Sequence, residues 1–189
     1  GKTDTAEVGL NVEPADDFRI LDLTPREQIG TVYIAYYGRS PDPTGLDFWV
    51  NQHEKGSAVG HAGRVLENIA ESFRQVVSLS PDDPENTENM SFELFRTPDL
   101  ADQQMVADFV NNVYNNLFNR DVEGTPDDPT TGHGFWTQTI LSRLDDGDPI
   151  GDIMIDIAAG AQERDAQVLM NKIKAGLSFA QAYQHVAGA

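Results

Sequence analysis

One helix–loop–helix phrase occurs twice in this chain and limits what the chain can fold into. The first copy spans residues 32–39, a loop rich in Pro and Asp, and residues 45–49. The second copy spans residues 113–120, a longer loop of the same kind, and residues 132–136. Each copy ends on one of the two tryptophans of the sequence. Such a repetition predicts a duplicated structural unit, and it has to be recognised before single elements are assigned.

The first copy is preceded by the signals of a helix start. Thr24 is placed to cap the helix, Pro25 suits its first position, and Glu27 completes a capping box. The apolar residues that follow recur with helical spacing and predict one buried face, made of Ile29, Val32, Tyr33, Tyr36 and Tyr37. Gly38 is expected to end this helix in a left-handed conformation.

The next elements also read as helices. Thr44 is expected to cap a second helix that Gly56 ends, and a third helix is expected at about 59–77. Thr97 and the proline after it predict the start of the strongest helix of the chain. Its apolar face consists of Val106, Phe109, Val110, Val113, Tyr114, Leu117 and Phe118.

The second copy continues the helical pattern to the end of the sequence. Asn119 tolerates the left-handed exit that Gly38 makes in the first copy, and Gly147 is expected to close the helix that carries Trp136. A helix follows at Ile150, Ile153, Met154 and Ile157. Gly176 is expected to end another helix, and Ser178 to cap a last short one. These patterns predict an all-α fold, a compact helical bundle of about eight helices from two duplicated helix–loop–helix units.

Composition shifts predict four segments. Residues 1–23 form an N-terminal arm, 24–79 the first repeat unit, 80–96 an acidic, Pro-containing linker, and 97–189 the second repeat unit. The length suits one compact domain that contains both units.

The charge of the chain excludes several classes of partner. Lys and Arg number 13 against 31 Asp and Glu, for a formal net charge of −18. Such a surface repels phosphate, so nucleic acid and anionic membranes are not expected partners. No apolar run is long enough for membrane insertion, and an export signal is expected only outside this segment. The absence of cysteine excludes disulfides and thiolate chemistry.

The loop of the second copy is a candidate calcium site. It carries the carboxylates of Asp121, Glu123, Asp127 and Asp128 within a few positions. Hard carboxylate oxygens of this kind bind Ca²⁺, which is the one cofactor that the sequence suggests. The spacing lacks the closing glutamate of a calcium loop, and a solvated acidic turn is the structural alternative.

The aromatic residues of the two copies are candidates for sugar binding. Trp49, Trp136 and Tyr37 are placed to stack on sugar rings, while Asn115 is placed to hydrogen-bond hydroxyl groups. Further candidates of the same two kinds are Tyr36, Tyr114, Gln52, Asn111, Asn112 and Asn116. The alternative is that the aromatic residues form the core and the asparagines form the solvated side of their helix.

No motif of a known catalytic chemistry is present. His53 and Glu54 lack the second histidine of a zinc-protease helix. The sequence has no nucleophile elbow, phosphate-binding loop or dinucleotide fingerprint. Because acidic residues abound, no pair of them stands out as a glycosidase dyad. The chain is therefore not expected to be an enzyme.

The repeated phrase resembles a bacterial domain of unknown function, DUF 4214. The first copy is similar to that family from Tyr33 to Val50, through Gly38, Arg39, Pro41, Asp42, Gly45, Leu46 and Trp49. The second copy is similar at Tyr114, Arg120, Gly132, Phe135 and Trp136. It departs from the pattern at Asn119, at His133 and in its enlarged loop.

This resemblance implies a non-catalytic role outside the cell. The family is similar to modules of surface-layer proteins, adhesins and calcium-dependent repeat toxins. It therefore implies an extracellular or cell-surface module for attachment or presentation, with surface polysaccharide or a partner protein as its ligand. A fainter similarity to the linker domains of phycobilisomes leaves open a scaffold that joins protein subunits. An enzyme that acts on polysaccharide is the third alternative.

Overall fold

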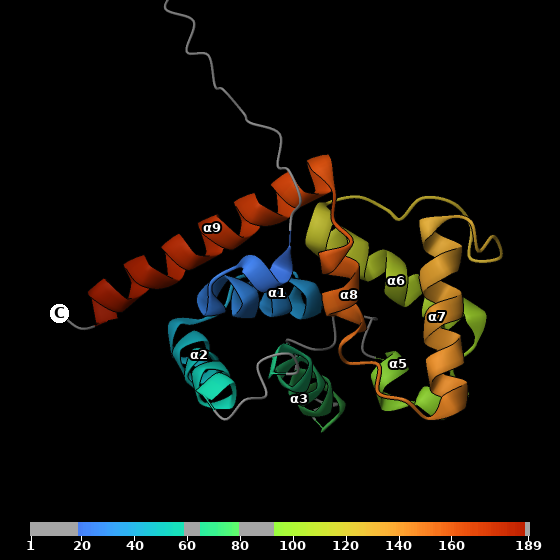
Figure 1. Cartoon of the computed structure of the whole chain (residues 1–189), viewed down its shortest axis with the longest axis horizontal. Helices are drawn as coiled ribbons and strands as arrows, with labels where there is room; N and C mark the ends of the chain where they lie inside the picture. The colour runs from blue at the N-terminus through green and yellow to red at the C-terminus, as the bar shows by residue number, and fades with distance from the viewer. Residues whose placement is uncertain (1–18, 59–64, 80–92, 188–189) are drawn as a thin grey trace, which may run out of the picture.

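Helix α1 (Pro25–Tyr37) lies at the centre of the fold, with the other helices arranged around it (Figure 1). The computed structural model describes residues 19–58, 65–79 and 93–187. Within these ranges the chain is all-helical and has no strand, which confirms the all-α prediction. The helices packed against α1 are α2 (Pro43–Ala58), α3 (Val65–Leu79), α6 (Gln103–Phe118), α8 (Ile153–Ala159) and α9 (Glu163–Ala187).

Helix α1 is buried on all sides, whereas the sequence predicted a single buried face. Every residue from Gln28 to Tyr36 is buried. The reason is that α1 has neighbours all round, so its polar residues are covered too. These residues are satisfied locally: the Gln28 side chain donates to the carbonyl oxygens of Ile20 and Leu23, both at 3.1 Å. The Thr31 hydroxyl donates to the carbonyl oxygen of Glu27 at 2.9 Å.

Both ends of α1 follow the predicted signals. Thr24 and Glu27 form the capping box, with Pro25 in the first turn. Gly38 adopts the left-handed conformation, with φ of 63°. Asn119 does the same after α6, with φ of 57°, as predicted for the second copy. The local signals at these positions therefore fix both ends of α1 and the C-terminal end of α6.

Two predicted caps are wrong, because in each case a nearby aspartate caps the helix instead. Helix α2 begins at Pro43, and the Asp42 carboxylate accepts a hydrogen bond from the Gly45 N–H at 2.7 Å, so Thr44 lies inside the helix. Helix α6 begins after Asp102, whose carboxylate accepts from the Met105 N–H at 2.8 Å. The Thr97 segment forms only the short 3-10 helix η4 (Pro98–Leu100).

Two predicted helix ends are also wrong. Helix α2 continues past Gly56 to Ala58. Helix α9 is continuous through Gly176, so Ser178 caps no separate helix. A Cβ atom at Gly176 would lie 2.6 Å from the Ser40 hydroxyl oxygen, so this glycine serves the close crossing of α9 over the first loop. By contrast, α7 (Gly132–Asp146) ends at a left-handed Gly147, as predicted.

The arm and the linker are described only in part. Residues 1–18, 59–64 and 80–92 lie outside the described ranges, including most of both segments and the predicted start of the third helix. The described end of the arm forms η1 (Ile20–Asp22), and the described end of the linker forms α5 (Glu93–Arg96). Leu94 and Phe95 of α5 are buried in the core, so this end of the linker is not solvated. None of the described helices is apolar over a length that could cross a membrane.

Candidate functional site

In each copy of the repeated phrase the loop joins two helices at a corner, where a tyrosine of the first helix lies near a tryptophan of the second. In the second corner the Trp136 indole N–H donates to the Tyr114 hydroxyl at 3.2 Å. In the first corner Tyr33 and Trp49 line the same hollow and both pack on Phe73. A phenylalanine stands edge-on to each tryptophan, with ring centroids 5.1 Å apart in the first corner and 4.9 Å in the second. The repeated sequence thus produces the same aromatic arrangement twice.

The arginine after each first helix also stacks on a tyrosine. Arg39 lies over the Tyr37 ring, 5.3 Å from its centroid, and Arg120 lies over the Tyr114 ring at 5.2 Å. Arg120 forms a further ion pair with Asp165 of α9 at 2.6 Å. The arginines therefore tie each loop to an aromatic ring, and in the second corner also to α9.

The first helix of each corner approaches the glycine of the following helix closely only in the first corner, at Gly45. A Cβ atom at Gly45 would overlap the Tyr33 hydroxyl. At Gly132 the nearest atom would be the Tyr114 hydroxyl at 3.5 Å, which is ordinary contact. In the second corner a Cβ atom at Gly134 would overlap the enlarged loop, which, rather than the first helix, lies against α7.

Trp49 separates two surface hollows and lines both. The Tyr37 hollow has a volume of about 300 Å³ and is lined by Tyr33, Tyr37, Arg39, Asp42, Trp49 and Phe73. The Asn68 hollow has a volume of about 360 Å³ and is lined by Phe48, Trp49, Gln52, Gly56, Val65, Asn68, Ile69 and Ser72. Both volumes are within the range of small-molecule sites, roughly 300–1,000 Å³. Trp49 and Tyr37, two of the predicted ligand-binding residues, are thus brought together at one site.

The rings at this site are held in place from the core side. Trp49 packs on Phe73 with ring centroids 5.0 Å apart, and Tyr33 meets Phe73 edge-on at 4.9 Å. Burial raises the pKa of Tyr33 to about 12, and the nearby Asp42 carboxylate acts in the same direction. The Tyr33 hydroxyl is therefore neutral at physiological pH and takes part in hydrogen bonds rather than acid–base chemistry.

The other predicted sugar-binding residues lie elsewhere. Trp136 belongs to the second corner and lines neither hollow. Asn115 donates to the Asp121 carboxylate at 2.8 Å, and Asn111 donates to the same oxygen at 3.2 Å. Asn116 donates to the carbonyl oxygen of Ala35 in α1 at 3.0 Å. These asparagines fasten the enlarged loop and α1 to α6, whereas the structural alternative considered for them was the solvated side of their helix.

The predicted calcium ligands are engaged separately. Asp121 accepts from the two asparagines, Asp127 accepts from Gln103 at 2.6 Å, and Asp128 accepts from the Thr130 hydroxyl at 2.6 Å. Glu123 lies 3.9 Å from Arg120, with its side chain 88% exposed. The described part of the chain contains no group of three or more His, Asp or Glu side chains placed to hold a metal ion. A calcium site therefore stays a prediction of the sequence and contributes no chemistry to the site described here.

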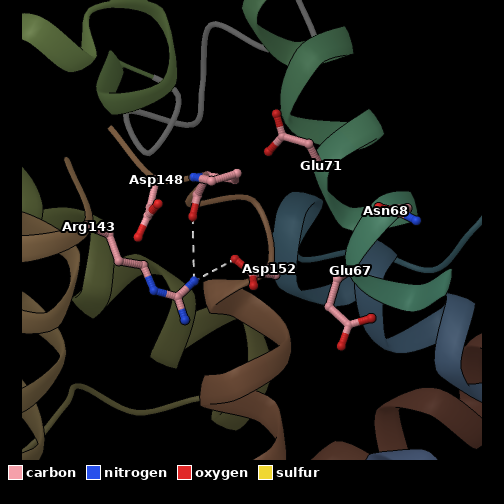
Figure 2. A pocket seen from close by; sticks show the side chains of 7 residues that line it. Glu67, Asn68, Glu71, Arg143, Asp148 and Asp152 are labelled. Carbon is pink, nitrogen blue, oxygen red and sulfur yellow. Dashed lines mark hydrogen bonds and ion pairs between the residues drawn. The ribbon is translucent and has the colours of Figure 1, made fainter. Parts of the chain in front are cut away.

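A third cavity, the acidic pocket, lies between α3 and the segment that joins α7 to α8 (Figure 2). Its volume is about 520 Å³, and its lining residues are Glu67, Asn68, Glu71, Arg143, Asp148, Pro149 and Asp152. Arg143 forms ion pairs with Asp152 at 2.7 Å and with Asp156 at 3.0 Å. Glu71 forms an ion pair with Arg74 at 2.7 Å. Half of the carboxylates that line the pocket are thus already neutralised by arginine.

The Glu71–Arg74 pair makes stability depend on pH. Burial alone would raise the pKa of Glu71, but hydrogen bonds and charge from Arg74 lower it below its usual value of 4.5. A lowered carboxyl pKa stabilises the fold above the unfolded-state pKa, and this stability is lost as pH falls below about 4.5 and through the folded-state pKa.

Glu71→Gln is therefore expected to lower the melting temperature at neutral pH and to flatten its decline in acid. Arg74→Gln should have the same effect, and the double variant should add nothing, as measured by thermal unfolding across pH. Full additivity of the two changes would contradict the pairing.

Sequence reasoning missed every contribution of α3 to these cavities. Phe73, Asn68 and Glu67 come from a helix that carries no recognisable motif. The repeated phrase does mark Phe48 of α2, the aromatic residue before Trp49, but the pattern does not show that Phe48 is 53% exposed. Comparison of the chain with protein-family models, with curated proteins and with solved structures gave no match.

Proposed function

We propose that this chain is a non-catalytic attachment module that binds a surface polysaccharide at Trp49. The observation that carries the proposal is the position of the Trp49 ring, which lines two open hollows and packs on Phe73. A ring fixed in this way offers an apolar face to the C–H face of a sugar and loses little conformational entropy on binding.

Polar groups around the two hollows suit sugar hydroxyls. Gln52, Asn68 and Ser72 line the Asn68 hollow, and their amide and hydroxyl groups both donate and accept hydrogen bonds. Arg39 and Asp42 line the Tyr37 hollow. A few polar groups placed around an apolar wall are typical of sites that fix the orientation of a small ligand.

The charges favour an uncharged or cationic glycan as the ligand, and they favour its binding without hydrolysis. The net charge of −18 disfavours anionic polysaccharides through repulsion. Glycoside hydrolysis generally requires two carboxyl groups at the scissile bond. Among the described residues that line the two hollows, Asp42 is the one carboxylate. The resemblance to the DUF 4214 family supports a cell-surface setting, with the ligand on the envelope of the same bacterium or a neighbouring one.

Replacing Trp49 with alanine is expected to weaken polysaccharide binding at least tenfold, about 1.4 kcal/mol in binding free energy. Binding is measured by calorimetry with purified bacterial surface polysaccharides and with the neutral hexamer of N-acetylglucosamine. Trp136→Ala is the matched control, because it removes the same side chain from the equivalent corner. Circular dichroism checks that both variants fold. Equal affinities of wild type and Trp49→Ala, or binding to none of these glycans, would overturn the proposal.

A further inference from the structure

The Asn68 hollow has an uncharged lining, whereas the surface of the chain is strongly charged. Among the described residues that line this hollow none is ionisable, although 23% of the chain is Asp, Glu, Lys or Arg. The Tyr37 hollow, by contrast, has Arg39 and Asp42 in its lining. An uncharged lining does not offset the loss of hydration of an ion. The ligand group that enters the Asn68 hollow is therefore neutral.

Two aromatic rings and two aliphatic side chains give this hollow its apolar surface. Phe48 stands edge-on to Trp49, with 82° between the ring planes, and it is 53% exposed. Val65 and Ile69 of α3 belong to the same lining. Helices α2 and α3 pack against each other here (Figure 1), and a Cβ atom at Gly56 would lie 2.9 Å from a Val65 methyl carbon. The hollow therefore offers apolar contact of the size of a methyl group beside the Trp49 ring.

Each of the two helices also adds a side-chain amide to the lining. Gln52 comes from α2 and Asn68 from α3, and neither side-chain amide has a hydrogen-bond partner within the described residues. The Ser72 hydroxyl donates to the backbone carbonyl oxygen of Asn68 at 2.8 Å, so its own oxygen is left to accept a hydrogen bond. The lining thus supplies both donors and acceptors without any charge.

We infer that the Asn68 hollow binds the acetamido group of the sugar that stacks on Trp49, so that the ligand is a polysaccharide of N-acetylated amino sugars. This inference rests on the proposed function, because Trp49 holds the ring that carries the group. An acetamido group is neutral and combines a methyl group with one carbonyl acceptor and one N–H donor. The methyl group contacts Phe48, and the amides of Gln52 and Asn68 pair with the carbonyl and N–H groups. A hydroxyl at the same position of the sugar has neither the methyl group nor the carbonyl.

The test compares the hexamer of N-acetylglucosamine with the glucose hexamer of the same linkage, which has a hydroxyl in place of each acetamido group. Calorimetry is expected to show that wild type binds the N-acetylated hexamer roughly tenfold more tightly. The double variant Gln52→Met, Asn68→Leu keeps the shape of both side chains without their amides. It is expected to lose this preference and to keep the wild-type affinity for the glucose hexamer.

The matched control is the double variant Gln138→Met, Asn171→Leu. It makes the same two changes at exposed positions of α7 and α9 that do not line the hollow. The control should keep the tenfold preference, and circular dichroism checks that both double variants fold.

The outcomes separate the acetamido site from the proposed function. Loss of the preference in the hollow variant alone supports the site. A preference that the hollow variant retains, or the same loss in both double variants, overturns it. If wild type binds both hexamers equally and Trp49→Ala weakens both, the acetamido site fails while attachment at Trp49 stands. If wild type binds neither hexamer, the acetamido site fails, and if it also binds no surface polysaccharide, the proposed function fails as well.

Discussion

Replacing Gly134 with alanine is expected to lower the free energy of unfolding by about 3 kcal/mol. A Cβ atom on this residue would overlap the carbonyl group of Asp128. That carbonyl accepts hydrogen bonds from the Thr131 hydroxyl at 2.8 Å and from the Thr131 N–H at 3.0 Å. Thr131 in turn caps α7, so the loop cannot move aside without disturbing the helix start. Urea unfolding followed by tryptophan fluorescence measures the loss.

Gly132→Ala is the matched control for this prediction. It makes the same chemical change two residues earlier, where the new Cβ atom would have neighbours no closer than 3.5 Å. Alanine also favours helix over glycine, so stability should stay equal or rise by about 0.5 kcal/mol. If the two alanine variants prove equally stable, the enlarged loop does not pack on α7 as described.

Replacing Tyr36 with phenylalanine is expected to cost about 2 kcal/mol, or a melting temperature lower by about 5 °C. Tyr36 is fully buried, and its hydroxyl lies 2.8 Å from the carbonyl oxygen of Ala70 and 2.9 Å from that of Gly151. Burial raises the pKa of this hydroxyl well above its usual value, so it keeps its proton and donates. The change leaves buried carbonyl oxygens without their donor, which thermal unfolding by circular dichroism detects.

Thr137→Val provides the contrast for Tyr36→Phe. Thr137 is also fully buried, but its hydroxyl has no hydrogen-bond partner within the described structure. Replacement of a side chain that has an unpaired buried hydroxyl by one of the same shape without it is expected to raise the free energy of unfolding by about 1 kcal/mol. A loss of stability in this variant equal to that of Tyr36→Phe would contradict this explanation, because a hydroxyl without a hydrogen-bond partner would then matter as much as a bonded one.

The sequence predicts the parts of this fold that depend on short-range interactions. The capping box at Thr24 and the left-handed residues Gly38, Asn119 and Gly147 are confirmed, because each depends on neighbours within one helical turn. The wrong caps occur where two polar residues compete within a few positions. Asp42 lies directly before Pro43, which suits the first helical position, and so displaces Thr44.

The remaining errors depend on contacts between residues far apart in sequence. Gly176 has the local appearance of a helix end, but its role is to let α9 cross over Ser40. The same limit applies to the site. Trp49 and Tyr37 belong to one motif, so the sequence names them as candidates together, whereas Asn68 and Asp148 line one pocket only after the chain folds. No pattern in the sequence marks them as partners.

The Trp49 site is tested most directly by measuring the fluorescence emission of one tryptophan at a time. Trp136→Phe leaves Trp49 as the single tryptophan of the chain, and Trp49→Phe leaves only Trp136. Titration with the N-acetylglucosamine hexamer should change the emission of Trp49 in a saturable way, because the sugar covers an indole that lines two open hollows. The emission of Trp136 should stay constant. A response confined to Trp136, or unchanged Trp49 emission while calorimetry records binding, would contradict the account.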